Sequence, residues 1–174
     1  MERDSYLYNI RRRGQVIAHK ILPDEVLSKF YFKVVLNKNL NLKTPKTFND
    51  KMQWLKLYYY PFNDTVIKCA DKYAVREYIE KKGYAKLLVP LIGHWENAKK
   101  IEWNELPDKF VMKCNHGCAY NILCNDKKNF DTRKAMYQLN KWLKEDFGAF
   151  NVENHYSKIK PHVITCEEFL GECI

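Results

Sequence analysis

Two lysines and a pair of glutamates stand at places in the sequence where a phosphate-bearing ligand could bind. Lys72 follows Asp71 at the expected start of a helix, and Lys113 ends an apolar run just before a turn. A lysine beside a turn of backbone N–H groups is one way in which proteins hold phosphate. Glu167 and Glu168 end a second apolar run, where a carboxylate can accept a hydrogen bond from an exocyclic amine or a ribose hydroxyl. Each feature alone is a weak indication of a ligand-binding site.

The spacing of cysteine and histidine does not favour a metal site. Three of the six cysteines lie close together in the sequence with one histidine between them: Cys114, His116, Cys118 and Cys124. Zinc sites usually show two tight pairs with two residues between the ligands, and no such pair is present. Cys114 and Cys124 lie in apolar stretches, where a free cysteine packs as a small hydrophobic residue. We therefore expect neither a metal site nor a disulfide framework.

The elements that must position these residues are expected to be helical in the first half of the chain. Apolar residues recur with a helical period over residues 23–36 and predict one helix. Thr47 and Asp50 have the spacing of a capping box, which predicts the start of a second helix. A third helix is expected over residues 71–83. The first helix is expected to face the core with one stripe: Val26, Leu27, Phe30, Tyr31, Val34 and Val35.

The second half of the chain alternates between strands and a helix. Strands are expected over residues 87–92, 109–114, 122–124 and 162–170, and a helix from Asp131 to Gly148. This order predicts an α+β fold with some α/β tendency, in which a helical N-terminal region precedes a lobe with a small antiparallel sheet.

Length and charge narrow the function classes. A chain of 174 residues is sufficient for one domain or two small lobes. It has no apolar stretch of the roughly 20 residues that cross a bilayer and no secretory leader, so a cytoplasmic location is expected. Residues 1–60 hold 12 of the 30 Lys and Arg residues but only 5 of the 21 Asp and Glu residues. A polyanion would be attracted to this region, which leaves open an RNA- or glycan-binding module.

Four stretches of the sequence resemble the TupA-like ATP-grasp family. They are LNLKTPKTFNDKMQWLKL (residues 40–57), ADKYAVREY (70–78), LPDKFVMKCNHG (106–117) and KPHVITCEEFL (160–170). The resemblance runs from about Leu22 to Leu170. It implies three segments: a basic N-terminal extension (1–21), a helical region with one strand (22–108) and an ATP-grasp nucleotide-binding lobe (109–174).

The resemblance also implies a function. Proteins of this family act in the synthesis of bacterial cell-surface polymers, either capsular polysaccharide or teichuronopeptide, and are often described as glycosyltransferases. The ATP-grasp fold implies ATP-dependent ligation of a carboxylate to an amine, with ATP and Mg²⁺ as cofactors. The partners it implies are ATP and an acidic surface polymer or its precursor. The residues expected to bind the nucleotide are Lys72, Lys113, His116, Gly117, Asn121, Glu167, Glu168 and Leu170.

Two departures from the family pattern affect these expectations. The family turn has glycines where this chain has Ala119 and Tyr120. If both positions need a positive φ, each substitution costs roughly 1–2 kcal/mol. The chain also stops at Ile174, before the lobe that carries the Mg²⁺ ligands in ATP-grasp enzymes. Turnover by these residues alone is therefore not expected, and no catalytic residue is assigned.

Two alternatives remain at this point. A glycosyltransferase of capsule or wall synthesis would use a nucleotide sugar and usually an Asp-x-Asp metal motif, which the sequence lacks. A polyanion-binding module would use the basic first third of the chain, although binding to nucleic acid is not expected. Peripheral contact with the inner face of the membrane is also open, but no amphipathic anchor with a clear basic face is visible in the sequence.

Overall fold

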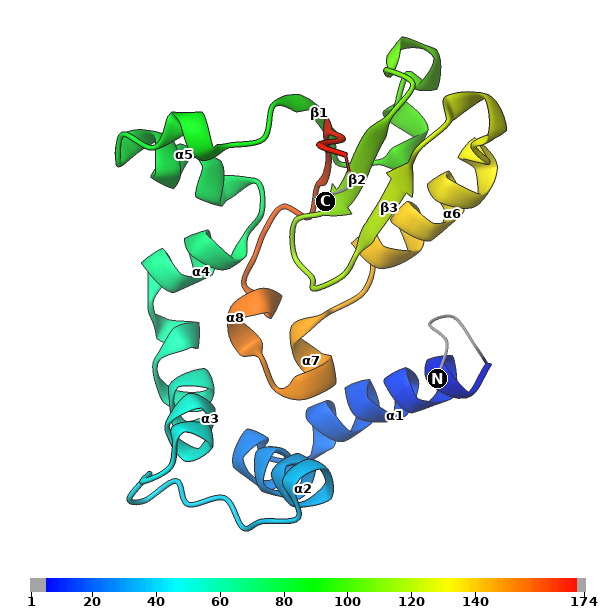
Figure 1. The fold of residues 1–174 in the computed structure, drawn as a ribbon. Coiled ribbons are helices and arrows are strands. Elements are labelled where there is room, and N and C mark those ends of the chain that lie inside the picture. Colours follow the sequence, from blue (N-terminus) through cyan, green and yellow to red (C-terminus); the bar gives the residue numbers. More distant parts are fainter. Residues whose placement is uncertain (1–5, 172–174) are drawn as a thin grey trace. The chain divides into compact units, whose positions relative to one another are not determined.

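The structure is a computed structural model in which residues 6–171 are described, and it divides the chain into two units (Figure 1). Unit 1 consists of Met1–Ile67 and Asp146–Lys158, and unit 2 consists of Lys68–Glu145 and Ile159–Ile174. Both units are therefore discontinuous in sequence. The segment boundaries expected from the sequence are drawn on a different basis and stay a prediction.

Unit 1 is helical. Its helices are α1 (Tyr6–Ile21), α2 (Asp24–Leu36), α3 (Phe48–Tyr58), a 3-10 turn (Tyr60–Phe62), α7 (Gly148–Asn151) and α8 (Asn154–Ser157), while α4 (Asp64–Ala70) runs across the sequence boundary between the units. The core of unit 1 gathers apolar side chains from both of its segments: Leu27, Phe32, Leu40, Leu42, Leu57 and Val152. Within the described part of the chain, none of the helices combines the length and the apolar character needed to cross a bilayer.

The helix α2 was predicted correctly in extent but wrongly in the face that it buries. Leu27 is buried as expected, and Tyr31 packs against the core, but Phe30 is 60% exposed and Val35 is 77% exposed. The buried positions instead include Ser28 and Phe32. Apolar residues occupy more than one side of this helix, and the extended segment with Leu40 and Leu42 decides which side is covered. A helical period in the sequence predicts that a helix forms, but not which side of the helix packs against the core.

The predicted capping box at the start of α3 is confirmed. The Thr47 hydroxyl accepts a hydrogen bond from the Asp50 backbone N–H at 3.1 Å, and the Asp50 carboxylate accepts one from the Thr47 backbone N–H at 3.1 Å. Asp50 Oδ1 also accepts from the Asn41 N–H at 3.3 Å. These hydrogen bonds, those from Thr47 first, hold the pKa of Asp50 below its ordinary value. The box therefore ties the extended segment to the helix as well as capping it.

Unit 2 contains a four-stranded antiparallel sheet in the order β1-β4-β2-β3 (Figure 1). The strands are β1 (Leu91–Trp95), β2 (Phe110–Cys114), β3 (Asn121–Cys124) and β4 (Ile164–Glu168). The helices of unit 2 are α5 (Ala74–Lys81), α6 (Thr132–Leu143) and four 3-10 turns (Ala85–Leu87, Ala98–Lys100, Trp103–Glu105 and Lys127–Asn129). A helical part and a small antiparallel sheet confirm the α+β class.

Two of the four strands, β2 and β4, lie within the predicted ranges; β3 begins one residue earlier than expected, at Asn121, and the first strand is displaced. A strand was expected over residues 87–92, but β1 begins at Leu91 and Leu87 lies in a 3-10 turn with 77% exposure. Pairing with β4 determines the extent of β1, because the residues that pair with β4 are Leu91, Gly93, His94 and Trp95. Hydrophobicity marks the run as a candidate strand, but the backbone of the neighbouring strand selects which residues pair.

Candidate functional site

The sheet of unit 2 has one face buried against a helix and one face carrying polar residues. Along β2, Phe110, Met112 and Cys114 are fully buried, and the register places Cys166 and Ile164 of β4 beside Met112 and Cys114. The helix α6 packs against β2 and buries Ala135 and Leu139. Because side chains alternate along a strand, Lys113 must lie on the opposite face.

A row of polar residues crosses that opposite face, one from each strand. The register pairs His94 of β1 with Thr165 of β4, Thr165 with Lys113 of β2, and Lys113 with Asn121 of β3. Directly paired residues in an antiparallel sheet point to the same face. We call His94, Thr165, Lys113 and Asn121 the polar row. Two of its members, Lys113 and Asn121, are among the residues predicted to bind the nucleotide.

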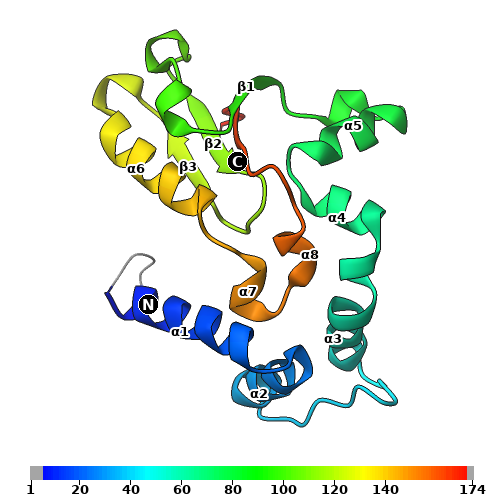
Figure 2. The ribbon, with the colours of Figure 1, turned by 180° about the vertical axis from the view of Figure 1, so that it is seen from behind.

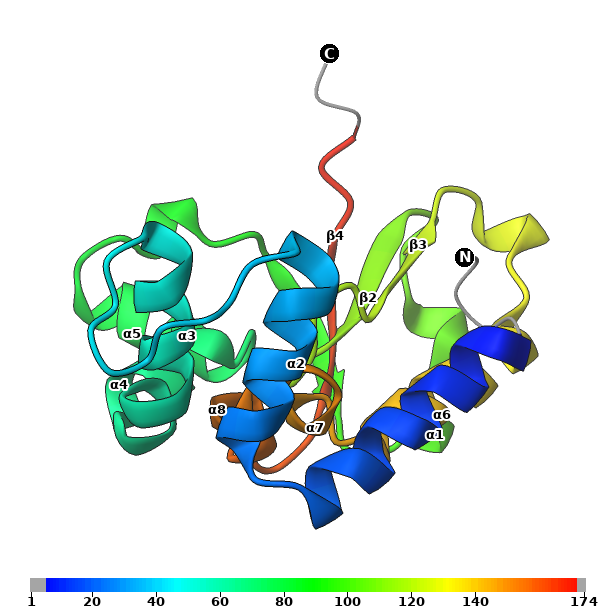
Figure 3. The same cartoon turned by 90° about the horizontal axis from the view of Figure 1, so that it is seen from below.

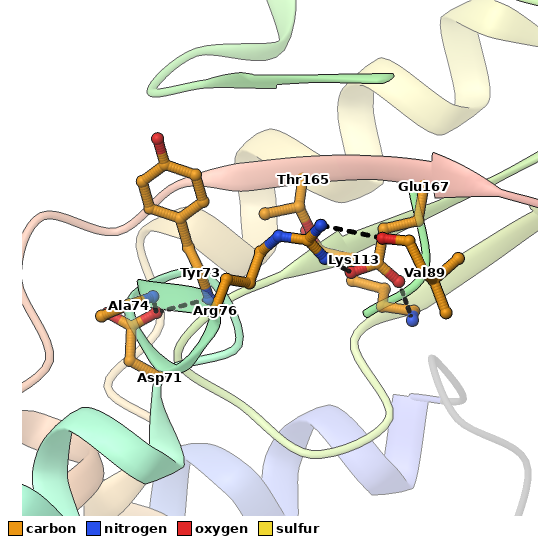
Figure 4. Close-up of polar contacts among 8 residues, drawn as sticks. All are labelled: Asp71, Tyr73, Ala74, Arg76, Val89, Lys113, Thr165 and Glu167. Carbon is orange, nitrogen blue, oxygen red and sulfur yellow. Dashed lines mark hydrogen bonds and ion pairs between the residues drawn. The ribbon is translucent and has the colours of Figure 1, made fainter. Parts of the chain in front are cut away.

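Glu167 lies on the same face, two residues along β4 from Thr165, and two cations converge on it (Figure 4). The Lys113 ammonium donates a hydrogen bond to Glu167 Oε2, and Arg76 Nη1 lies 3.5 Å from Glu167 Oε1. Arg76 also donates to the Val89 carbonyl at 2.8 Å. The Glu167 side chain is only 8% exposed, so the carboxylate depends on these partners for its solvation. Two cations on one carboxylate leave one positive charge in excess at this face.

The start of α5 is fixed by Asp71, which positions Arg76 one turn later (Figure 4). Asp71 Oδ1 accepts hydrogen bonds from the backbone N–H groups of Tyr73 at 2.8 Å and Ala74 at 3.0 Å. These are otherwise unpaired donors at a helix start, as in an N-cap. Asp71 Oδ2 accepts from Asn115 Nδ2 at 3.0 Å. One buried carboxylate therefore joins α5 to the turn that follows β2.

Asn115 joins three segments of unit 2 and was not among the predicted site residues. Besides its bond to Asp71, Asn115 Nδ2 donates to the Pro161 carbonyl at 3.1 Å, and Asn115 Oδ1 accepts from the Val163 N–H at 2.9 Å. The side chain is 1% exposed. Its amide thus sets the start of the turn relative to β4.

Lys72 holds the turn from the other side. Its ammonium donates to the Gly117 carbonyl in a short hydrogen bond, and its backbone N–H donates to the Asn115 carbonyl at 3.2 Å. Burial is the main cause that lowers the pKa of Lys72. Both Lys72 and Gly117 were predicted to contact a nucleotide. The structure places them together at the turn, whereas Lys113 lies in the polar row.

The side chain of His116 does not reach the polar face. It is 0% exposed, stacks on His162 with ring centroids 3.5 Å apart, and its Nε2 donates to the Trp142 carbonyl of α6 at 3.0 Å. Burial first, and His162 second, lower the pKa of His116 to about 4. A nucleotide contact by His116 would therefore come from its backbone.

The remaining predicted residues lie at the edges of this face. Asn121 is exposed at the start of β3, Glu168 is exposed at the end of β4, and Leu170 beyond it is 73% exposed. Of the two positions where the family has glycine, Ala119 has a φ of 57°, and Tyr120 is not among the described residues with a positive φ. The backbone strain anticipated from the sequence thus falls on Ala119.

Three residues of this face were not among the predicted site residues: His94, Thr165 and Arg76. His94 stacks on Tyr73 with ring centroids 4.4 Å apart. Thr165 is fully buried, and its hydroxyl donates to the Lys113 carbonyl at 3.4 Å. Arg76 and Thr165 lie within two of the family-like stretches but were not singled out, and His94 lies outside all four. The strand register brings His94 and Thr165 to this face, and α5 brings Arg76 to it; a single sequence supplies neither arrangement.

The arrangement is suited to an anionic ligand. Lys113 can exchange its carboxylate partner for a phosphate oxygen, because both are oxygen anions that accept from an ammonium. Glu167 keeps Arg76 as a partner if this exchange occurs. His94 and Asn121, the exposed members of the polar row, supply further groups that can donate or accept hydrogen bonds.

Comparisons with known proteins give one result. A family model described as TupA-like ATPgrasp matches residues 50–170, which include α5, the whole sheet and the turn after β2. No curated protein and no solved structure matches the chain.

Proposed function

Because this chain belongs to the TupA-like ATP-grasp family, we propose that unit 2 binds ATP on the face of its sheet that carries the polar row. The observation that carries this proposal is the ion pair between Lys113 and Glu167, with Arg76 as a second cation on the same carboxylate. Lys113 contacts the phosphates. Glu167, relieved of one cation, accepts a hydrogen bond from the adenine amino group.

The other predicted residues take supporting roles. The backbone next to Leu170 lies at the ring edge of the adenine, and Glu168 and Asn121 lie at the rim of the face. Lys72 and Gly117 hold the turn that carries backbone N–H groups toward the phosphates.

The reaction that we propose for the enzyme is ATP-dependent ligation of a carboxylate to an amine during synthesis of a cell-surface polymer. ATP supplies the phosphoryl group that activates the carboxylate. The substrate is an acidic polymer such as capsular polysaccharide or teichuronopeptide, or its precursor. Among residues 6–171, no group of three or more His, Cys, Asp or Glu side chains is placed to hold a metal ion. The proposal therefore assigns no residue to Mg²⁺.

Isothermal titration with ATP tests the nucleotide site. Lys113→Met is expected to weaken ATP binding at least tenfold, since a charge-assisted hydrogen bond to phosphate contributes about 1.5–3 kcal/mol. Lys109→Met, an exposed lysine just before β2, is the matched control and should bind ATP like the parent chain. Equal losses in the two variants, or no heat with the parent chain at millimolar ATP, would overturn the proposal.

Thermal shift separates this function from the glycosyltransferase alternative. ATP should raise the melting temperature of the parent chain, and UDP-sugars should not. A larger shift with a UDP-sugar, abolished in Lys113→Met, would assign the same face to a nucleotide sugar instead.

A further inference from the structure

Several polar side chains of α1 contact the rest of unit 1. The Arg12 guanidinium lies over the Phe150 ring of α7, 4.0 Å from its centroid, and Arg12 Nε donates to the Tyr8 hydroxyl at 3.1 Å. His19 Nε2 lies 3.0 Å from Asn154 Oδ1, at the start of α8. Figure 2 shows α1 running beside α7, to which it is packed. These contacts fix the rotation of the helix about its axis.

Four apolar side chains of α1 consequently point outward, while Ala18 packs against the core. Leu7 is 67% exposed, Ile10 is 48%, Ile17 is 58% and Ile21 is 73%. These four residues are separated by three, seven and four positions, and Gly14 falls between Ile10 and Ile17, so that they share one side of the helix. We call them the outer row. Figure 3 views the molecule from the side on which the whole length of α1 is visible.

Basic residues border the outer row. Arg11, Arg13 and Lys20 are exposed, and each lies three or four positions from a member of the row. The sequence of α1 contains no Asp or Glu. This is the reverse of an ordinary surface helix, whose apolar side faces the core. It is the pattern of a helix that lies in a membrane interface, where long basic side chains extend from an apolar side toward the headgroups.

We propose that α1 docks on the surface of a bilayer rich in anionic phospholipids, with the outer row in the acyl boundary and the three basic residues on the headgroups. Charge complementarity selects this partner. Pairing the outer rows of two copies of the chain would bring two sets of three cations together without a counter-charge, whereas an anionic surface supplies it. The inference does not depend on the nucleotide site, which belongs to unit 2.

Vesicle flotation with the full chain tests the docking. The chain should float with phosphatidylglycerol-rich vesicles and remain unbound with pure phosphatidylcholine. The double variant Ile17→Asn, Ile21→Asn should lose at least tenfold in partitioning. Tyr84→Asn, Leu87→Asn changes two comparably exposed apolar residues of unit 2 and should partition like the parent chain.

The charge contribution has its own variant pair. A basic residue near an anionic surface contributes about 1 kcal/mol, or roughly a fivefold change in partitioning. Arg13→Gln, Lys20→Gln should therefore reduce partitioning by more than tenfold, and the exposed pair Lys99→Gln, Lys100→Gln should change it little.

Three outcomes would overturn the proposal. They are the absence of flotation at low salt, equal losses in the variants and their controls, and a lipid-free dimer that Ile17→Asn, Ile21→Asn converts to a monomer. The last result would assign the outer row to a second copy of the chain. ATP titration of the same variants provides a separate readout, because loss of ATP binding affects only the nucleotide proposal.

Discussion

At the scale of single residues, Glu167 is a buried charged residue on the sheet face that carries the polar row, and it needs cationic partners to compensate for lost hydration. Its carboxylate is buried and joined to both Lys113 and Arg76. The pattern of two glutamates ending an apolar run allowed Glu167 to be named as a site residue. It could not show that Lys113, named on separate grounds, is its partner. That pairing depends on the β2–β4 register, which places Glu167 opposite Val111.

Replacing Glu167 by Gln should destabilise unit 2 by about 3 kcal/mol, because it leaves two cations without their carboxylate. Urea unfolding measures this free energy. Glu168→Gln, the exposed neighbour, should change it by less than about 0.5 kcal/mol. Similar values for the two variants would mean that the ion pairs around Glu167 contribute no stability.

Ala119 is a second residue whose conformation has a measurable cost. Its φ of 57° lies in the left-handed region, which glycine adopts without the steric penalty of a Cβ. Ala119→Gly should raise the free energy of unfolding by about 1 kcal/mol. Ala135→Gly, at a buried position inside α6, should lower it by at least about 1 kcal/mol, because helix propensity and a buried methyl group are both lost. A decrease for Ala119→Gly would contradict the assignment of strain to this turn.

His116 should make unit 2 sensitive to acid. Burial lowers its pKa to about 4, whereas an exposed histidine titrates near 6.5. Between these values the unfolded chain binds a proton that the folded chain does not. Stability is therefore complete above pH 6.5, falls as the pH drops toward 4, and levels off below that. Each such histidine contributes a slope of at most about 1.4 kcal/mol per pH unit.

Denaturant unfolding at several pH values checks this expectation. His116→Gln, which can still donate to the Trp142 carbonyl, should reduce the slope between pH 6.5 and 4. His155 in unit 1 has its pKa lowered to about 4 by burial and should account for a separate part of the slope. An unchanged slope in His116→Gln would show that His116 binds its proton over the same pH range in the folded and the unfolded chain.

At the scale of elements, local chemistry was predictable and the choice of partner was not. The capping box of α3 involves residues three apart, so the sequence contained all that was needed to place it. The start of β1 depends on β4, which is far away in the sequence, and the buried side of α2 depends on packing partners outside the helix; both were predicted wrongly. The helix α1 was not predicted, although Leu7, Ile10, Ile17 and Ile21 have helical spacing and form an apolar side that was not identified from the sequence.

The cap of α3 makes a local prediction. Thr47→Ala removes the acceptor of the Asp50 N–H and the donor to the Asp50 carboxylate, and should cost about 1 kcal/mol of stability. Thr65→Ala, an exposed position near the start of α4, is the comparison and should cost less than about 0.5 kcal/mol. Thermal unfolding followed by circular dichroism measures both. Equal costs would mean that the cap contributes nothing beyond helix propensity.

At the scale of the whole molecule, the two proposed ligands belong to different units, and this separation can be measured. In amide hydrogen exchange, ATP should slow exchange in β2, β4 and the turn between Cys114 and Asn121, and leave α1 unchanged. Anionic vesicles should do the opposite. Slowing of α1 by ATP would show that the two units respond together to the nucleotide.

The discontinuity of unit 1 has a consequence for how the chain is made. Its core includes Val152, which is fully buried among side chains from the first sixty residues. A ribosome delivers those residues first and Val152 only after nearly all of unit 2 has been translated. Until then, the apolar side chains of the N-terminal helices that pack around Val152 stay exposed. A chaperone would bind them during this period of synthesis. Unit 1 can finish folding only after α7 and α8 have left the ribosome.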